Sequence, residues 1–427
     1  MDKLDTIKIR LYELLKCFSN AQDLVSPLLT NHHQQVAYLS FRLAQEIKLP
    51  IEQQKDIFLA ALVHDIGALS INERLEIIEN EPAYINNHAF IGAKLIGEFK
   101  PLQNSARIIK FHHLPWENGK GSVYNGENVP FGSHIIHLAD RVCLKINPKN
   151  NVLSQVSKII DNINKNINKI YEPNLVHAMT ELSKKEYIWL DLISSSPVKK
   201  IDTGIFDNVE IEIDDVINLA LIFSQIIDFR SSFTAQHSAG VAKTAQKLAE
   251  FVGFSEYDCK VMLAAGYLHD LGKLAINNSI LEKPNKLNEE EFNEIRTHTY
   301  YTYQLLNTIP QFQRIKEWAS YHHERLDGNG YPFHLKGDSI SLGSRIMAAA
   351  DVFTAIKENR PYRKEMSDNN AVKVLNDMVN SGALDEKVVG TLVNNFKIIN
   401  EVRENAQYEA SERYKKFYQD SKLIGDS

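Results

Sequence analysis

Histidine and aspartate residues in the C-terminal half of this 427-residue sequence stand where they could bind metal ions. His269 is followed directly by Asp270, and Asp351 ends the apolar run that begins at Ile346. An ionisable Asp in such a run is costly unless a cation or a donor compensates it. Imidazoles and carboxylates suit a borderline transition metal, and a carboxylate can bridge two ions about 3.5 to 4 Å apart. The sequence therefore predicts a two-metal centre built from His237, His269, Asp270, His298, His322, His323 and Asp351.

The dipeptide His269-Asp270 is the core of this prediction. Adjacent residues on a regular helix point about 100° apart, so two that converge on one ion lie best near a helix end. Gly272 favours that interpretation, because glycine lets the chain turn away after a helix. Alone, the dipeptide carries little weight, since an isolated histidine is more often a solvated or core residue. The other histidines supply the context that favours metal binding.

The sequence also contains an internal repeat. Sliding the chain by 205 to 211 positions places the candidate ligands of the C-terminal half on residues of the same types in the N-terminal half. Ten of the 15 histidines fall in these paired positions, which random scatter does not produce. The repeat predicts two homologous domains, residues 1–200 and 201–427. The N-terminal counterparts are His32, His64, Asp65, His88, His112, His113 and Asp140.

Amphipathic helices are the elements that must position these residues. Apolar residues recur at intervals of three and four between Val241 and Val252, which is the pattern of a helix with one buried face. Alternating, strand-like runs are scarce, so we predict an all-α fold. The exception lies at Val209–Ile213, which could form a short strand, although the two aspartates after it also suit a helix start. Met1–Leu15 reads as an amphipathic helix, and Ser194–Pro197 is the expected domain boundary.

Composition excludes several classes of protein. Hydrophobic residues make up 44% and charged residues 24%, which excludes wholesale disorder. A net charge of -6 argues against a nucleic-acid polymer or an anionic membrane as partner. The longest apolar stretch, Ile217–Phe229, is too short to span a bilayer, and Met1–Leu15 lacks the apolar core of a signal peptide. Three distant cysteines fit a reducing compartment, so we expect a cytoplasmic protein.

Longer motifs in the C-terminal half resemble those of the HD-GYP phosphodiesterases, a branch of the HD metal-dependent phosphohydrolases. The resemblance covers about residues 215–400. Its most specific part is the string from the paired histidines to Gly-Tyr-Pro. The motifs are His269-Asp270-Leu-Gly-Lys273, His298, His322-His323-Glu324-Arg-Leu-Asp327-Gly328-Asn-Gly330-Tyr331-Pro332, Asp351-Val-Phe and Arg360-Pro361-Tyr362-Arg363.

The resemblance implies how the ligands are shared between two metal ions, iron or manganese in this family. Asp270 bridges the two ions. Some members carry a Glu four residues before the first histidine that helps to bind a third metal, but Phe233 stands there, so we expect two ions. One ion takes His237, His269, Asp270 and Asp351, and the other takes His298, His322, His323 and Asp270.

The resemblance further implies hydrolysis of a cyclic dinucleotide, with cyclic di-GMP expected first, to the linear dinucleotide. Tandem HD arrangements resemble those of cyclic GMP-AMP phosphodiesterases, which makes that nucleotide the alternative substrate. A weakly catalytic cyclic-dinucleotide receptor or scaffold, and an HD enzyme that acts on mononucleotides, are also compatible with the motifs. The implied catalytic residues are Lys273, Asp270 and His269, and the implied substrate-binding residues are Lys273, Tyr331, Arg360 and Arg363.

Two of these roles have simpler explanations. Lysine and arginine can neutralise phosphate, and the planar fork of arginine suits that task, but Lys273 and the two arginines could also be solvated surface charges. The loop Gly328–Pro332 could be an ordinary turn. In the family this loop lies beside the metal site and is also discussed as a docking surface for cyclic-dinucleotide synthases.

The N-terminal half keeps every ligand position and loses the other motifs. Ala68 stands where Lys273 stands, and Leu114–Gly119 replaces the string that leads to Gly-Tyr-Pro. We interpret this half as a degenerate HD domain that binds metal and lacks the catalysis of the family, with regulation, nucleotide binding and dimerisation as open roles. The competing interpretation is a relic in which the histidines merely hydrogen-bond one another.

Overall fold

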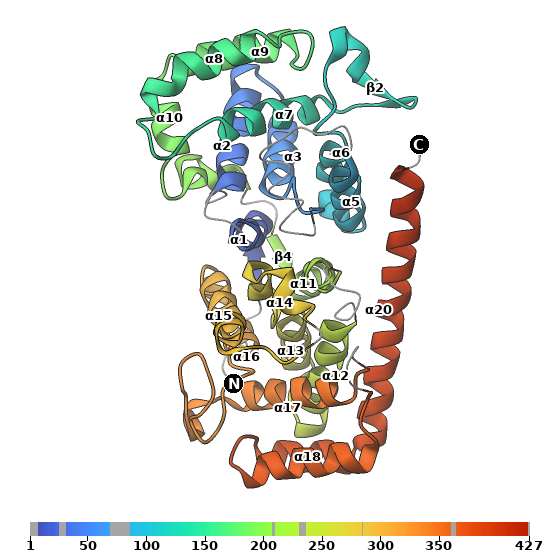
Figure 1. Ribbon diagram of the computed structural model, residues 1–427. Coiled ribbons are helices and arrows are strands. Elements are labelled where there is room, and N and C mark those ends of the chain that lie inside the picture. Colours follow the sequence, from blue (N-terminus) through green and yellow to red (C-terminus); the bar gives the residue numbers. More distant parts are fainter. Residues whose placement is uncertain are drawn as a thin grey trace. The chain divides into compact units, whose positions relative to one another are not determined.

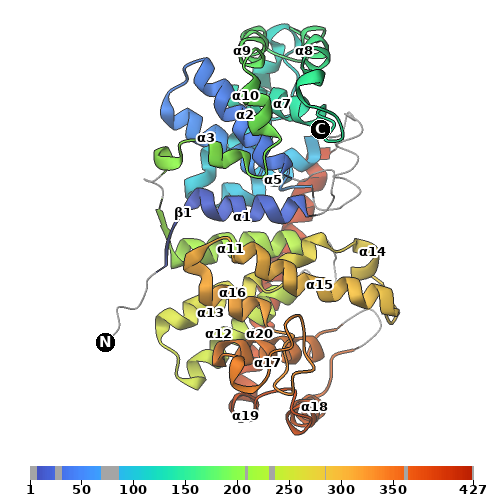
Figure 2. The same ribbon diagram turned by 90° about the vertical axis from the view of Figure 1, so that its left-hand side faces the viewer.

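The computed structural model describes residues 7–24, 31–68, 86–206, 210–229, 236–283, 285–359 and 364–425 (Figures 1 and 2). The fold is helical, which confirms the predicted all-α class. The chain forms two compact units. The first unit spans Arg10–Glu210, and the second spans Ile211–Asp420 together with the strand residues up to Ile9. In the described part of the chain, no helix is both long enough and apolar enough to cross a membrane.

In the first unit, helices surround an aromatic core. Helix α2 packs against α3 and α7, and α5 packs against α6. The rings of Phe58 and Phe206 stack with centroids 4.5 Å apart, and Phe41 lies 6.0 Å from Phe58. Such burial of large aromatic side chains fixes the helices that carry the histidines. The helices are α1(Leu11–Asp23), α2(His32–Glu46), α3(Ile51–Leu62), α5(Asn86–Gly97), α6(Gln103–Lys110), α7(Phe131–Leu144), α8(Val156–Asn164), α9(Pro173–Ser183) and α10(Glu186–Leu192).

The second unit repeats this plan. Helix α12 lies between α13 and α17 and packs on both, and the helix predicted from Val241 to Val252 is confirmed as part of α12. The 3-10 helix η7(Leu271–Ala275) packs on α15. The helices are α11(Ile213–Asp228), α12(His237–Val252), α13(Glu256–Leu268), α14(Asn278–Leu281), α15(Glu289–Leu306), α16(Gln313–Ser320), α17(Leu342–Ile356), α18(Asp368–Asn380), α19(Glu386–Asn394) and α20(Phe396–Gly425).

Two short sheets depart from the helical pattern. Strand β1(Lys8–Arg10) pairs with β4(Glu210–Glu212), so the strand expected near Val209–Ile213 exists. The single helix predicted for Met1–Leu15 is wrong at Lys8–Arg10, because Ile9 is buried as a strand residue and α1 begins only at Leu11. In the first unit, β2(Val123–Tyr124) and β3(Glu127–Asn128) form a hairpin after the segment that replaces the Gly-Tyr-Pro string.

Glycine is required after each His-Asp pair, although for a different reason from the one expected. Gly272 has no positive φ, so it does not turn the chain away from a helix. A Cβ atom at Gly272 would instead lie 2.0 Å from the backbone oxygen of His298, and one at Gly67 would lie 2.0 Å from that of His88. The missing side chain lets the His-Asp turn press directly against the helix that carries the next histidine.

Gly272→Ala should therefore destabilise the second unit. Relief of this contact requires η7 and α15 to separate, and we expect a loss of about 3 kcal/mol, or roughly 6 to 12 °C in melting temperature. Gly390→Ala is the matched control, because a Cβ there meets nothing within 4 Å in the interior of α19. The control should be neutral or stabilising by about 0.5–1 kcal/mol. Equal melting temperatures for the two variants, measured by circular dichroism, would contradict the close-contact explanation.

Candidate metal centre and active site

Five segments of the second unit bring the predicted ligands together. His237 begins α12, His269 and Asp270 directly follow α13, His298 lies within α15, the paired histidines follow α16, and Asp351 lies on α17. Three of these helices begin with caps encoded in the sequence. Ser255 accepts from the backbone N–H of Asp258, Asn288 and Glu291 form a capping box, and Ser341 accepts from Ser344. Local sequence thus fixes where these three ligand-bearing helices begin.

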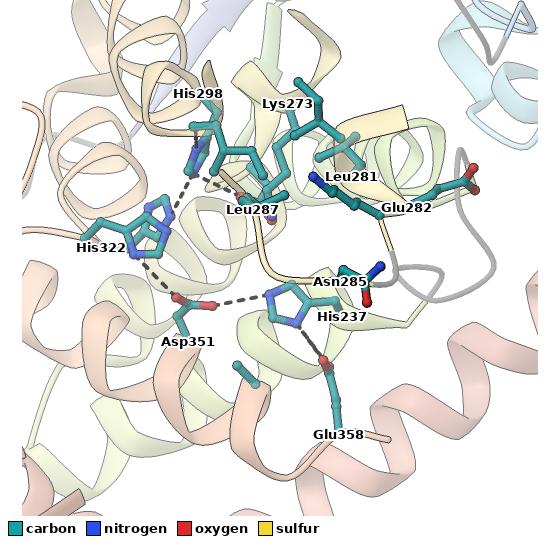
Figure 3. Close-up of a pocket in the computed structure, with 16 residues that line it drawn as sticks. His237, Lys273, Leu281, Glu282, Asn285, Leu287, His298, His322, Asp351 and Glu358 are labelled. Carbon is teal, nitrogen blue, oxygen red and sulfur yellow. Dashed lines mark hydrogen bonds and ion pairs between the residues drawn. The ribbon is translucent and has the colours of Figure 1, made fainter. Parts of the chain in front are cut away.

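Three histidines are oriented by their own backbone. The Nδ1–H groups of His269, His298 and His322 donate to the carbonyl oxygens three residues upstream, at 2.7, 2.5 and 2.6 Å. Such a bond fixes the tautomer and leaves Nε2 with its lone pair. In Figure 3 the rings of His298 and His322 turn toward one cavity. This is the arrangement that imidazole ligands adopt around a metal.

The Nε2 atoms and carboxylates form two adjacent clusters. In one, His237, His269 and Asp351 place their ligand atoms within 4.8 Å of one another, and in the other His298 and the following paired histidines do the same. Asp270 faces both clusters, because its Oδ2 lies 3.2 Å from His269 Nε2 and its Oδ1 lies 3.4 Å from His298 Nε2. A carboxylate with its two oxygens turned to two clusters has the geometry of a bridging ligand.

The buried polar atoms of this site fit a bound cation. His269 Nε2 and Asp270 Oδ1 are buried and have no hydrogen-bond partner. His298 Nε2 and His322 Nε2 lie 3.3 Å apart. Buried polar atoms without partners are rare in proteins and costly, and a divalent cation would satisfy all of these lone pairs together. The buried His/Asp clusters are therefore consistent with metal sites.

Electrostatics favours the metal-binding protonation states of His298, His322 and Asp270. Burial, opposed by Asp270, lowers the pKa of His298 to about 3. Burial and the neighbouring imidazoles hold the pKa of His322 well below its ordinary value. Burial would raise the pKa of Asp270, but His269 and Lys273 outweigh it and hold this pKa well below its usual range. Neutral imidazoles and an ionised carboxylate are the forms that coordinate metals.

Glu358, which no motif in the sequence marked as a site residue, orients the first histidine of the set. Glu358 is buried, and its two oxygens lie 3.0 and 3.1 Å from His237 Nδ1 (Figure 3). Burial alone would lower the pKa of His237, but Glu358 and Asp351 together raise it to about 10. Gln407 of α20 donates to Glu358 at 2.5 Å. Glu358 lies beyond Ile356, the last residue of α17, so helical spacing from Asp351 does not mark it.

Glu358→Gln should weaken metal binding without removing a ligand. Loss of the carboxylate beside His237 Nδ1 lowers the basicity of the imidazole, and we expect an affinity about 10–100-fold lower in calorimetric metal titration. Glu250→Gln, a half-exposed position on the helix of His237, is the matched control and should bind as the unaltered protein does. Unchanged affinity in Glu358→Gln would exclude the orienting role.

Lys273 lies at the mouth of the metal clusters. Its Nζ atom is 2.6 Å from Asp270 Oδ2, and about a fifth of its side chain is exposed. The clusters open into a cavity of about 360 Å³. A polar rim bounds the other side of the cavity and consists of Glu282, Lys283 and Asn285. No sequence motif marks these residues, so the rim could not be predicted.

The Gly-Tyr-Pro loop packs beside the second cluster. The ring of Tyr331 lies 4.9 Å from that of His323, and the guanidinium of Arg296 lies 5.1 Å from the Tyr331 ring. The buried carboxylate of Glu324 accepts from the backbone N–H groups of Phe333 and Leu335 at 2.7 and 2.9 Å, which closes the loop. The structure thus brings Tyr331 to the cluster, whereas Arg360 and Arg363, like Phe233, lie outside the described residues.

The chain resembles known proteins along almost its whole length. Sequence profiles of the HD domain match residues 29–144 and 222–388. The 3'3'-cGAMP-specific phosphodiesterase 1 of Vibrio cholerae is 32% identical over 398 residues, which are 91% of this chain and 92% of that protein. The chain belongs to the HD-domain cyclic-dinucleotide phosphodiesterases. This confirms the family and the enzyme class that the motifs implied.

Two further comparisons bear on this phosphodiesterase. The cyclic di-GMP phosphodiesterase response regulator RpfG of Xanthomonas campestris is 38% identical, but over 154 residues, which are 36% of this chain and 41% of that protein. The crystal structure of the cyclic GMP-AMP specific phosphodiesterase V-cGAP3 of V. cholerae matches with a TM-score of 0.65 at 22% identity. The match covers 92% of this chain and 98% of that one. The match to V-cGAP3 shows that the two proteins share a fold.

The first unit of this HD phosphodiesterase repeats the ligand clusters. His64 and His112 again donate through Nδ1 to carbonyl oxygens three residues upstream, at 2.9 and 2.7 Å. His113 Nε2 lies 3.1 Å from His88 Nε2. Ala68, at the position of Lys273, is fully buried. The clusters are Asp65, His88, His112 and His113, and His32, His64 and Asp140.

Proposed function

We propose that this protein hydrolyses 3'3'-cGAMP to the linear dinucleotide at the site of its second unit. One observation carries the choice of nucleotide: the similarity to a 3'3'-cGAMP-specific enzyme runs through both units, over 91% of the chain. The similarity to RpfG covers 36% of the chain, and the similarity to a cyclic di-GMP phosphodiesterase of Vibrio cholerae covers 52%. The comparisons therefore favour the alternative substrate over cyclic di-GMP, which the motifs alone had put first.

We assign the metal ligands as the resemblance implied, with iron or manganese as the ions. Two such ions would supply an activated water and neutralise the phosphoryl oxygens. Asp270 would be a ligand of both ions, because its two oxygens face the two clusters. The pairing of Glu358 with His237 keeps that ring in place from outside the cluster.

Lys273 contributes the positive charge closest to the bridging carboxylate. Its ammonium group at 2.6 Å from Asp270 is placed to neutralise a phosphoryl oxygen or to give a proton to the leaving oxygen. The rim supplies polar groups for the bases. A carboxylate such as that of Glu282 accepts from the donor edge of guanine, and an amide such as that of Asn285 pairs with adenine. Tyr331, Arg360 and Arg363 remain predicted substrate contacts.

Comparing the two nucleotides tests this proposal. Metal-loaded protein should hydrolyse 3'3'-cGAMP with a kcat/KM at least about tenfold above that for cyclic di-GMP, the discrimination that one well-placed base contact supplies. Product is measured by chromatography at matched concentrations, with the Asp270→Asn variant as the blank. Equal or faster turnover of cyclic di-GMP would overturn the choice of nucleotide and leave the reaction class intact.

Two other expectations stay predictions: that the units fold as separate domains divided near residue 200, and that the Gly328–Pro332 loop docks cyclic-dinucleotide synthases.

A further inference from the structure

The first unit contains a buried histidine that the repeat does not explain. His33, next to His32, is 1% exposed, and its Nδ1 contacts the buried carboxylate of Asp23. Its Nε2 is buried and has no hydrogen-bond partner. Ligand atoms of His33, His64 and Asp65 lie within 4.8 Å of one another. A histidine held at Nδ1 by a carboxylate and presenting Nε2 to other ligands has the orientation of a metal-binding histidine.

The second unit has no such histidine. At the same repeat spacing, Ser238 stands where His33 stands, and Asp228 stands where Asp23 stands. The hydroxyl of Ser238 donates to Asp228 Oδ1 at 2.8 Å. Corresponding carboxylates thus orient an imidazole in one unit and a hydroxyl in the other. The first unit has a donor that metals bind, and the second has a hydroxyl already engaged with its carboxylate.

His64, which belongs to two clusters, indicates which metal ion His33 would coordinate. His64 belongs both to the cluster with His32 and Asp140 and to the cluster with His33 and Asp65. Its Nδ1 is bonded to the carbonyl of Ala61, so only Nε2 can bind a metal, and one lone pair serves one ion. If both clusters bind metal through His64, they therefore share one ion.

We propose that the first unit binds its own transition-metal ions, and that His33, oriented by Asp23, is an additional ligand that makes one of them a structural ion. Catalytic metal sites keep a position open for water or substrate, and a further imidazole fills such a position. Two contacts agree. Arg141 binds Asp140 Oδ2 through Nε and an Nη atom at 2.9 and 2.7 Å, and Ala68 supplies no ammonium group.

The proposal is tested on the full chain carrying Asp270→Ala and His322→Ala, which removes ligands of the second unit. This background should retain about two manganese or iron ions per chain by elemental analysis, given a two-ion site. Adding His33→Ala should lower affinity in chelator competition at least about tenfold and change the visible absorption of the cobalt-substituted protein. Ser238→Ala in the same background is the matched control and should change neither.

Asp23→Asn keeps the test decisive if His33→Ala does not fold. The amide has the same shape but no longer selects the Nδ1–H tautomer, so affinity should fall about tenfold. A background protein that holds no metal would overturn the proposal, as would a folded His33→Ala variant with unchanged affinity and cobalt spectrum. Neither outcome depends on nucleotide hydrolysis. A failure of this proposal therefore leaves the proposed substrate untouched, and the reverse also holds.

Discussion

Asp270→Asn should reduce the kcat for cyclic-dinucleotide hydrolysis by at least about 10³-fold, the largest effect of any single substitution that we expect. Asp270 faces both clusters of the second unit, at 3.2 Å from His269 and 3.4 Å from His298. It lies closer to the second cluster than Asp351, whose Oδ2 is 3.9 Å from His323. An amide has almost the same shape but carries no charge and offers a single acceptor oxygen. The substitution would remove the negative charge that Asp270 places between two bound cations, so their mutual repulsion would rise while the fold persists. Single-turnover kinetics with metal-loaded protein measures the loss.

The control for this variant is Asp214→Asn on α11. Asp214 is exposed and pairs with Lys260 at 2.9 Å, so the same chemical change should leave kcat within about twofold. Metal content is measured for both variants. Turnover by Asp270→Asn near that of the control, in protein that still binds metal, would contradict the bridging role.

Lys273→Ala should reduce kcat by about 10²-fold, the size of effect that follows loss of one charged group at a transition state. This substitution also installs in the second unit the residue that the first unit carries, Ala68. The ammonium group lies against Asp270 and beside the cavity, where phosphoryl charge must be neutralised. Because Lys273 is not a ligand, metal content should persist. We expect kcat to fall while KM stays unchanged.

Lys260→Ala is the matched control for this lysine. Lys260 is a partly exposed residue of α13 whose partner is the surface carboxylate of Asp214. Its removal should leave both kinetic constants unchanged. If Lys273→Ala kept more than half of the turnover, Lys273 would be a surface charge, and neutralisation of the phosphoryl oxygens would fall to the ions alone.

The candidate ligands that the structure brings together could be predicted from sequence because their types are restricted and their order repeats. Few residue types other than His, Cys, Asp and Glu bind such ions. Two copies of the same order marked His64 and Asp140 as firmly as His269 and Asp351. The helices were predictable for a similar reason, since their apolar spacing is periodic. Both signals are contained in residue type and position along the chain.

What the sequence did not show depends on contacts between distant segments. Glu358 acts on His237 across 121 positions, and nothing in its neighbourhood marks that pairing. Gly272 was placed correctly but explained wrongly, because the close approach of the His298 backbone is a tertiary contact. The motifs also do not determine the nucleotide, because metal ions and lysine recognise phosphate, whereas the bases are distinguished by other pocket residues such as those of the rim.

The most direct test of the central claim is anomalous X-ray scattering from crystals of the protein grown with manganese or iron. We predict two peaks in the second unit, one among His237, His269 and Asp351 and the other among the three histidines of the neighbouring cluster, with Asp270 touching both. A difference map with no peak in this cavity, from protein that hydrolyses cyclic dinucleotides, would contradict the two-metal centre.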